Sequence, residues 1–230
     1  MKLVAILGSP RGMKRYTGTL LNEVLQEAQK AGADTEIFLL NDETIMTCKG
    51  CLETCHTKGK CYQDDDFEKI KKALLAADGI ILATPNYVFN VSAHMKAFLD
   101  RCGLLMHCQL LSGKYAAVVV TSGGSDPTVV ENYLKDVCVQ AFGFWYLGSV
   151  SAVELQFEDP DEHKQIMESA AALGARMVRA IENRETIPEQ EEEHNQTYEI
   201  FKYMTMMLKD RWPFAWDYWN SIQNDNKKTI

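Results

Sequence analysis

Three short apolar segments recur along the chain, and each is nearly free of polar side chains. They cover residues 2–7, 79–84 and 116–121. Strands that are covered on both faces of a parallel sheet have this continuous apolar pattern, so we expect three central parallel strands. Residues 35–40 and 145–153 fit two further strands.

Amphipathic segments lie between these strands. Apolar residues recur at helical spacing in two stripes, Leu20, Leu21, Val24, Leu25 and Ala28, and then Val91, Met95, Phe98, Leu99 and Cys102. Residues 128–141 and 161–183 are predicted to form the remaining helices. The alternation of strands and helices predicts an α/β fold, with a doubly wound parallel sheet and helices on both of its faces.

The C-terminal part of the chain has a different character. An acidic run at residues 189–193 is expected to be a solvated connector, and residues 198–219 are dense in aromatic and methionine side chains. Such side chains must leave water. We therefore expect a domain at 1–187 and an extension at 188–230 that packs on its own sheet or on a second subunit, in a homodimer or homotetramer. Alternatively, the aromatic side chains wall a substrate pocket.

Composition limits the partners of the protein. The 230 residues carry a formal net charge of −8, which argues against nucleic acid as a ligand. No apolar run approaches the ~20 residues that a membrane-spanning helix needs. The first apolar run ends at Gly8, which is too early for a signal peptide. We expect a cytoplasmic protein that binds neither nucleic acid nor membranes.

The loop after the first strand, residues 8–19, has the chemistry of a phosphate site. It leads into a helix, whose N-terminal N–H groups and dipole favour an anion. The candidate ligand residues supply hydroxyls, cationic groups and a close backbone approach; they are Ser9, Arg11, Lys14, Tyr16, Thr17, Gly18 and Thr19. A phosphate monoester fits this set. The alternative is an ordinary polar loop in which Thr17 caps the helix.

Two more loops follow the third and fourth strands. The first contains Pro85, Asn86, Tyr87, Val88, Phe89 and Asn90, and the second contains Thr121, Ser122, Gly123 and Gly124. In the flavodoxin-like strand order these loops face the phosphate loop at the switch point, where FMN binds. Tyr87 and Phe89 offer flat apolar walls, although each also fits a core position. Asn86 and Asn90 offer polar contacts to the edge of the flavin ring.

Four of the seven cysteines crowd into residues 48–61, with the spacing Cys48-x2-Cys51-x3-Cys55-x5-Cys61. Local sets of four cysteines bind iron–sulfur clusters or zinc. Three interpretations stay open: a [4Fe-4S] cluster, free or redox-active thiols, and zinc. His56 could replace one ligand, but we prefer a solvated loop histidine. Cys102, Cys108 and Cys138 fall on or near predicted helices and are expected to be buried apolar residues.

Three motifs resemble the NADPH-dependent FMN reductase and iron–sulfur flavoprotein branch of the flavodoxin-like superfamily. They are Gly-Ser-Pro-Arg at 8–11, Thr-Pro-x-Tyr at 84–87 and Lys-x-Phe-x-Asp-Arg at 96–101. The resemblance covers roughly residues 1–183 and implies a five-stranded sheet of order 2-1-3-4-5 with noncovalent FMN. The family often has Asn-Thr where this chain has Tyr16-Thr17. For the four clustered cysteines the resemblance implies a [4Fe-4S] cluster, although this chain has one extra residue between Cys51 and Cys55.

Two functions follow from these expectations. In the first, NAD(P)H reduces bound FMN, which passes electrons to a quinone, a nitroaromatic compound, free flavin or a similar small acceptor. In the second, the protein is an electron carrier that receives electrons from ferredoxin through the cluster and FMN. A non-catalytic zinc module is a weaker third alternative. We name no catalytic acid or base, because hydride transfer to a flavin needs no protein nucleophile.

Overall fold

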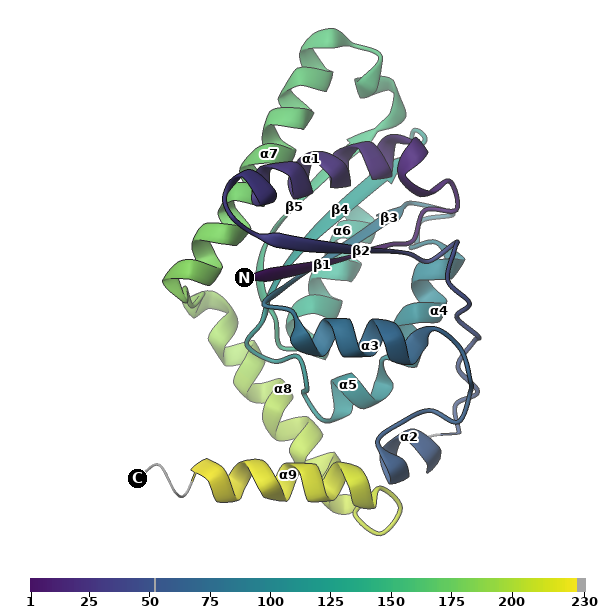
Figure 1. Cartoon of the computed structure of the whole chain (residues 1–230), viewed down its shortest axis with the longest axis vertical. Coiled ribbons are helices and arrows are strands. Elements are labelled where there is room, and N and C mark those ends of the chain that lie inside the picture. The colour runs from purple at the N-terminus through teal and green to yellow at the C-terminus, as the bar shows by residue number, and fades with distance from the viewer. Residues whose placement is uncertain (52, 227–230) are drawn as a thin grey trace.

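The computed structural model describes residues 1–51 and 53–226, and a five-stranded sheet lies at its centre (Figure 1). The strands are β1 (Lys2–Leu7), β2 (Asp34–Leu39), β3 (Gly79–Pro85), β4 (Tyr115–Ser122) and β5 (Trp145–Val153). All neighbouring strands are parallel, in the order β2-β1-β3-β4-β5. The flavodoxin-like sheet expected from the sequence is therefore confirmed.

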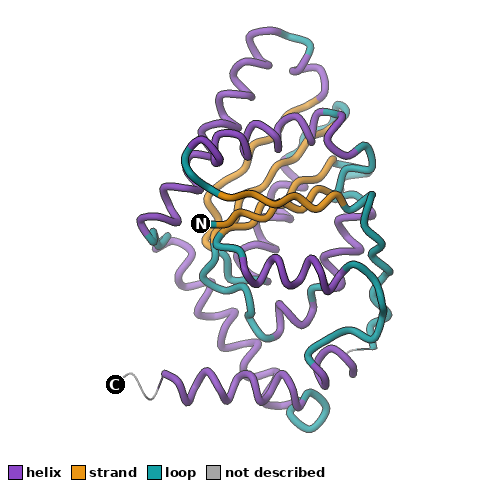
Figure 2. Tube along the Cα trace, in the orientation of Figure 1, coloured by secondary structure: helices purple, strands orange, loops and turns teal. Residues whose placement is uncertain are grey.

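Helices cover both faces of this sheet (Figures 1 and 2). One face carries α1 (Tyr16–Lys30) and α7 (Pro160–Asn183), and the other carries α3 (Phe67–Ala76), α4 (Ala93–Arg101), α5 (Gly103–His107) and α6 (Thr128–Asp136). Successive β1 side chains alternate between the two cores, so Leu3 packs toward α1 while Val4 packs toward α3. Because both faces are covered, the central strands are apolar at nearly every position.

Helices α1 and α7 approach each other closely at Gly174. A Cβ atom at this position would lie 2.1 Å from the carbonyl oxygen of Val24. Only glycine permits this backbone contact. The contact fixes α1, which begins at Tyr16, so the last four residues of the predicted phosphate loop at 8–19 form its first turn.

Four shorter helical segments complete the domain. They are η1 (Gly12–Lys14), α2 (Glu53–Lys58), the π-helix η2 (Val137–Ala141) and η3 (Glu154–Phe157). The helix predicted at 128–141 is therefore divided into α6 and η2. Helix α3 was not predicted, although Phe67, Ile70 and Leu74 recur at helical spacing and are buried.

The C-terminal extension consists of α8 (Pro188–Met207) and α9 (Pro213–Asn226). Residues 189–193 were expected to be a solvated connector. The segment is largely exposed, but it is helical and forms the first turns of α8. Proline at the first helical position and glutamates in the first turn both favour a helix start. Gln190 of α8 pairs with the backbone of Tyr146 through two hydrogen bonds of 2.9 Å, and so covers the edge of β5.

Helix α9 packs on the Cys-rich segment of its own chain and lies beside α2 in Figure 1. Trp212 and Ala215 form a small apolar core with Leu104 and Cys108 of the α5 region. Trp219 is fully buried, and its indole N–H donates to the carbonyl oxygen of His107 at 3.1 Å. The homodimer or homotetramer stays a prediction. Three apolar side chains of α8, those of Ile200, Tyr203 and Met207, are exposed and could contact a second subunit. Within the described residues, no helix is both long and apolar enough to cross a membrane.

Candidate functional site

A cavity opens at the carboxyl edge of the sheet, between the ends of β1, β3, β4 and β5. It is lined by Ser9, Arg11, Arg15, Tyr16, Thr17, Pro85, Asn86, Tyr87, Thr121, Ser122, Gly123 and Glu154. The three predicted loops therefore converge at one place. A fourth segment, the beginning of η3, joins them through Glu154.

The first loop turns tightly after β1. The backbone N–H groups of Gly12 and Arg11 donate to the carbonyl and hydroxyl oxygens of Ser9, at 3.0 and 3.3 Å. Ser92, the N-cap of α4, holds the same loop from outside, because its hydroxyl donates to the carbonyl oxygen of Gly8 at 2.6 Å. Ser92 was not predicted as a site residue, although a serine directly before an apolar helical stripe is an N-cap signal.

The second loop contains a tight two-residue turn. Tyr87 and Asn90 exchange two backbone hydrogen bonds of 2.9 and 3.1 Å, and Val88 and Phe89 between them have φ angles of 54° and 58°. Positive φ is rare outside glycine, and strain of this kind concentrates at functional sites. The turn leaves Tyr87 and Phe89 44% and 64% exposed, so the alternative that they are core aromatics is wrong.

The third loop is tied to the other two by side chains. The hydroxyls of Thr17 and Thr121 lie 2.6 Å apart and form a buried hydrogen bond. Thr17 lies in the first turn of α1 after the first loop, and Thr121 lies at the end of β4 before the third loop. Asn86 donates from Nδ2 to the Ser125 hydroxyl at 3.2 Å and to the Asp126 carbonyl at 3.4 Å. Its Oδ1 is buried in the cavity wall and has no hydrogen-bond partner among the described residues. Asn86 therefore lines the cavity and carries a buried acceptor without a protein partner in the described part of the chain.

Several predicted residues lie outside this cavity. Lys14 lines an open groove beside β2 that shares Arg11 and Arg15 with the cavity. Gly18 is buried beneath the loop, and the Thr19 hydroxyl donates to the Arg15 carbonyl oxygen. Val88, Phe89, Asn90 and Gly124 belong to the second and third loops but are not in the cavity wall. Arg15 lines the cavity and was predicted only as an added positive charge beside Lys14, and Glu154 lines it without having been predicted. No local motif marks Glu154, because only the fold brings the end of β5 to the phosphate loop.

The four clustered cysteines line a second cavity, together with residues of α3, α4 and α5. Cys48 and Cys51 are exposed, while Cys55 and Cys61 are partly buried. Lys71 and Arg101 also line this cavity and bring positive charge close to the thiols. The expected buried positions of Cys102, Cys108 and Cys138 are confirmed.

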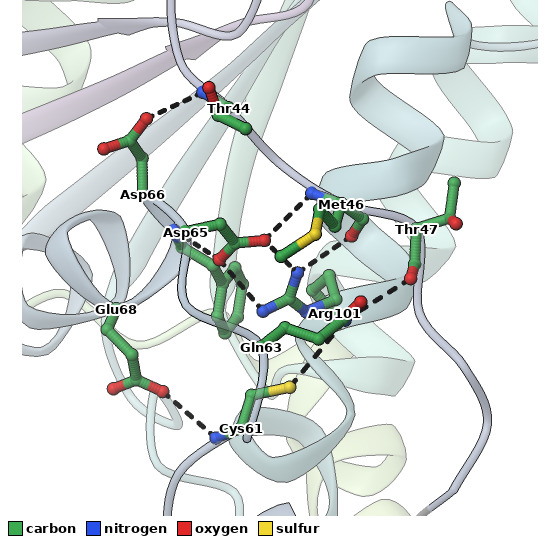
Figure 3. A network of polar contacts seen from close by, with 10 residues as sticks. Thr44, Met46, Thr47, Cys61, Gln63, Asp65, Asp66, Glu68 and Arg101 are labelled. Atoms are coloured by element: carbon green, nitrogen blue, oxygen red, sulfur yellow. Dashed lines mark hydrogen bonds and ion pairs between the residues drawn. The ribbon is translucent and has the colours of Figure 1, made fainter.

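A network of polar contacts holds the Cys-rich segment to the domain (Figure 3). The guanidinium of Arg101 donates to both carboxylate oxygens of Asp65, at 2.5 and 3.1 Å, and to the carbonyl oxygen of Met46 at 2.8 Å. Gln63 donates from Nε2 to the carbonyl oxygen of Thr47 at 3.4 Å and to the Cys61 sulfur at 3.9 Å. These contacts position both ends of the cysteine segment.

The cysteines fit an iron–sulfur cluster by their chemistry but not by their spacing in this structure. Four thiols with nearby cationic groups suit a cluster that carries negative charge. Nevertheless, no three histidine, cysteine, aspartate or glutamate side chains within 1–51 and 53–226 lie close enough to hold one metal ion. Binding of a cluster or of zinc therefore requires the cysteine side chains to come closer together than they are in this structure.

His56 is fully buried, so the expectation of a solvated histidine is wrong. Its Nδ1 lies 3.1 Å from the Cys55 sulfur, and its Nε2 lies 2.6 Å from Nδ1 of His107. Trp212 of the extension stacks against both imidazole rings, with ring centroids 4.2 and 5.1 Å apart. The histidine is buried because Trp212, directly before helix α9, packs on it, and the local sequence does not indicate this contact.

The buried histidine pair predicts a loss of stability at mildly acidic pH. Burial, and then the neighbouring His56, lowers the pKa of His107 to about 4. Between the ordinary histidine pKa of about 6.5 and this lower value, the unfolded chain binds a proton that the folded chain does not. The free energy of unfolding should therefore decrease as the pH falls from about 6.5 to about 4. Urea unfolding across this pH range measures the slope.

The matched control for this prediction is His107→Gln, which removes the titrating group. The variant should show a shallower dependence of the unfolding free energy on pH than the wild-type protein. Equal slopes for the two proteins would show that His107 is not the group responsible.

The fold and the cavity together define a flavodoxin-like protein with a cavity at the switch point of its sheet. A model of the NADPH-dependent FMN reductase family matches residues 1–158. An iron-sulfur flavoprotein from Archaeoglobus fulgidus is 32% identical over 212 residues, which cover 91% of this chain and 92% of that protein. The chain belongs to the NADPH-dependent FMN reductase family, and it is a flavoprotein oxidoreductase.

Two further comparisons extend this picture. An FMN-dependent NADH:quinone oxidoreductase 2 from Jannaschia sp. is 34% identical over 157 residues, 58% of this chain and 77% of that protein. Among solved structures, RosB with its bound intermediate 8-demethyl-8-formylriboflavin-5'-phosphate has a TM-score of 0.65 at 13% identity. The similarity covers 86% of this chain and 87% of RosB, and it shows that the two folds are alike.

Proposed function

We propose that the protein transfers electrons from NAD(P)H, through FMN bound in the cavity at the carboxyl edge, to a small acceptor such as a quinone, a nitroaromatic compound or a flavin. The observation that carries this proposal is the junction of three loops, tied by the 2.6 Å contact between Thr17 and Thr121. The quinone oxidoreductase from Jannaschia sp. supports both the donor and the acceptor class.

The residues of the cavity suit the parts of FMN. At one end, Arg11 and Arg15 and the N-terminus of α1 provide positive charge and N–H groups for a phosphate. At the other end, Tyr87 offers an aromatic surface, and the unused Oδ1 of Asn86 can accept a hydrogen bond from an N–H group of the flavin ring. When bound, FMN supplies the hydride and electron transfer chemistry. The protein itself contributes binding and orientation.

A second candidate function is that of an electron carrier, in which ferredoxin supplies electrons through a [4Fe-4S] cluster at the Cys-rich segment. The four cysteines around one cavity favour it, as does the iron-sulfur flavoprotein from Archaeoglobus fulgidus. The thiols are not close enough together in this structure to hold a metal ion. We therefore derive no electron path through this segment.

The absorption spectrum of protein purified without air distinguishes the two functions. The enzyme hypothesis predicts flavin bands alone and their bleaching by NADPH or NADH. The electron carrier hypothesis predicts an added broad shoulder, together with iron and sulfide, and slow bleaching by either nucleotide. Replacement of Cys61 by Ser should remove the shoulder, whereas replacement of the distant Cys138 by Ala should leave it. A colourless protein that contains zinc would contradict both hypotheses.

A further inference from the structure

Glu154 brings a negative charge into the cavity that we assign to the FMN phosphate. It is the first residue of η3, which follows β5, and it lines the cavity beside the phosphate loop. The side-chain amide of Gln156 accepts a hydrogen bond from the Val153 N–H at 2.9 Å and so shapes this turn. A Cβ atom at Gly123 would lie 3.9 Å from the Glu154 carboxylate, which places the carboxylate beside the third loop.

The carboxylate of Glu154 pairs with a cation of the phosphate loop. Its Oε1 lies 3.7 Å from the guanidinium of Arg15, and the two side chains are 36% and 49% exposed. Arg15 also lies over the ring of Tyr16, at 5.3 Å, and that ring contacts Phe157 of the same η3 segment with ring centroids 4.5 Å apart. Arg15 is thus held toward η3 rather than toward the centre of the loop.

The few charged residues of the cavity make the pairing of Arg15 with Glu154 important for the binding of an anion. Arg11, Arg15 and Glu154 are the charged residues in its wall, with a formal sum of +1. A phosphate monoester carries about −1.5 to −2 charges at pH 7. With Glu154 in place, the phosphate is only partly neutralised, and it must compete with the carboxylate for the Arg15 guanidinium.

We propose that Glu154 is a specificity-determining residue that weakens the binding of the phosphorylated flavin by holding Arg15 away from the phosphate. The inference rests on the proposed FMN site. It predicts that the preference for FMN over riboflavin is smaller than the two arginines alone would produce. Riboflavin has no phosphate, so its affinity should not depend on this ion pair.

The test is a titration of flavin-free protein with FMN and with riboflavin, followed by flavin fluorescence. Replacement of Glu154 by Gln should increase the affinity for FMN about 2- to 5-fold, the range that corresponds to an exposed ion pair, and leave riboflavin unchanged. The gain should shrink at high salt, because exposed charges are screened. The control Glu158→Gln removes an exposed charge outside the cavity wall and should change neither affinity.

The double variant Glu154→Gln with Arg15→Gln tests the mechanism. If Glu154 acts by holding Arg15, the gain in FMN affinity must be clearly smaller in the Arg15→Gln background than in the wild-type background. An equal gain in FMN affinity in both backgrounds would overturn the proposal. Weaker binding of both FMN and riboflavin to Glu154→Gln would also overturn it, because that result would mean that the carboxylate contacts the flavin itself. Absence of FMN and riboflavin binding to the wild-type protein would instead refute the proposed function.

Discussion

Replacing Arg101 by Met should lower the free energy of unfolding by about 3–5 kcal/mol, the usual cost of breaking a buried ion pair from one side. The side chains of Arg101 and Asp65 are 1% and 0% exposed. Burial acts to raise the pKa of Asp65, but hydrogen bonds from Arg101 and from the N–H groups of Met46 and Phe67 hold that pKa below its usual value. Without the guanidinium, the carboxylate would remain buried without its countercharge. Chemical denaturation at neutral pH measures the difference.

The matched control is Lys96→Met, which removes one partner of the exposed pair between Lys96 and Asp100 on the same helix. Exposed pairs of this kind contribute at most about 1 kcal/mol. If Arg101→Met also lowers the free energy of unfolding by less than about 1 kcal/mol, the buried charge of Asp65 must be stabilised by groups other than Arg101. The double variant Arg101→Met with Asp65→Leu should recover part of the lost stability, because it leaves no buried charge behind.

Loss of Arg101 should also disturb the Cys-rich segment. The guanidinium binds the carbonyl oxygen of Met46, and Asp65 accepts from the N–H of the same residue at 2.9 Å. Met46 comes just before Cys48, so this ion pair fixes the start of the cysteine segment on α4. The arginine that ends the third family motif is thereby explained as a structural support of the Cys-rich segment, whereas Asp100 before it forms the exposed pair with Lys96.

The second large effect concerns FMN. The double variant Arg11→Ala with Thr17→Ala should bind FMN about 100-fold more weakly, because a hydrogen bond to a charged group contributes about 1.5–3 kcal/mol and each 1.4 kcal/mol is a factor of ten. Arg11 supplies a cation at the cavity wall, and Thr17 holds the first loop against Thr121. Equilibrium titration of flavin-free protein with FMN measures the loss.

Lys14 provides the control for this experiment, since it is equally cationic but lines only the groove beside β2, whereas Arg11 lines both that groove and the cavity. Lys14→Ala should change the affinity for FMN by no more than about 3-fold, the magnitude expected for a screened surface charge. An unchanged affinity in the double variant would mean that the phosphate binds elsewhere. A large loss in Lys14→Ala would instead point to the groove beside β2.

Much of the molecule could be predicted from the sequence because its signals are local. Continuous apolar runs mark strands that are covered on both faces, and all five strands lie within one residue of the expected positions. The loops that begin after Leu7, Pro85 and Ser122 follow three of these strands directly, and because the strands are parallel, all three loops lie at the same edge of the sheet. Local patterns did not predict α3 or the helical start of α8, because charged residues interrupt the apolar stripe in both segments.

Contacts between residues that are distant in the chain were decided only by the tertiary structure. Glu154 reaches the phosphate loop because β5 ends beside β4, and nothing within its own segment predicts that contact. His56 is buried because Trp212, more than 150 residues later, packs on its ring. Sequence patterns thus determined the sheet and the place of the cavity at its carboxyl edge, since the strands and their ends follow from hydrophobic periodicity. Burial and charge pairing at the two cavities were decided by the packing of separate elements, which periodicity does not encode.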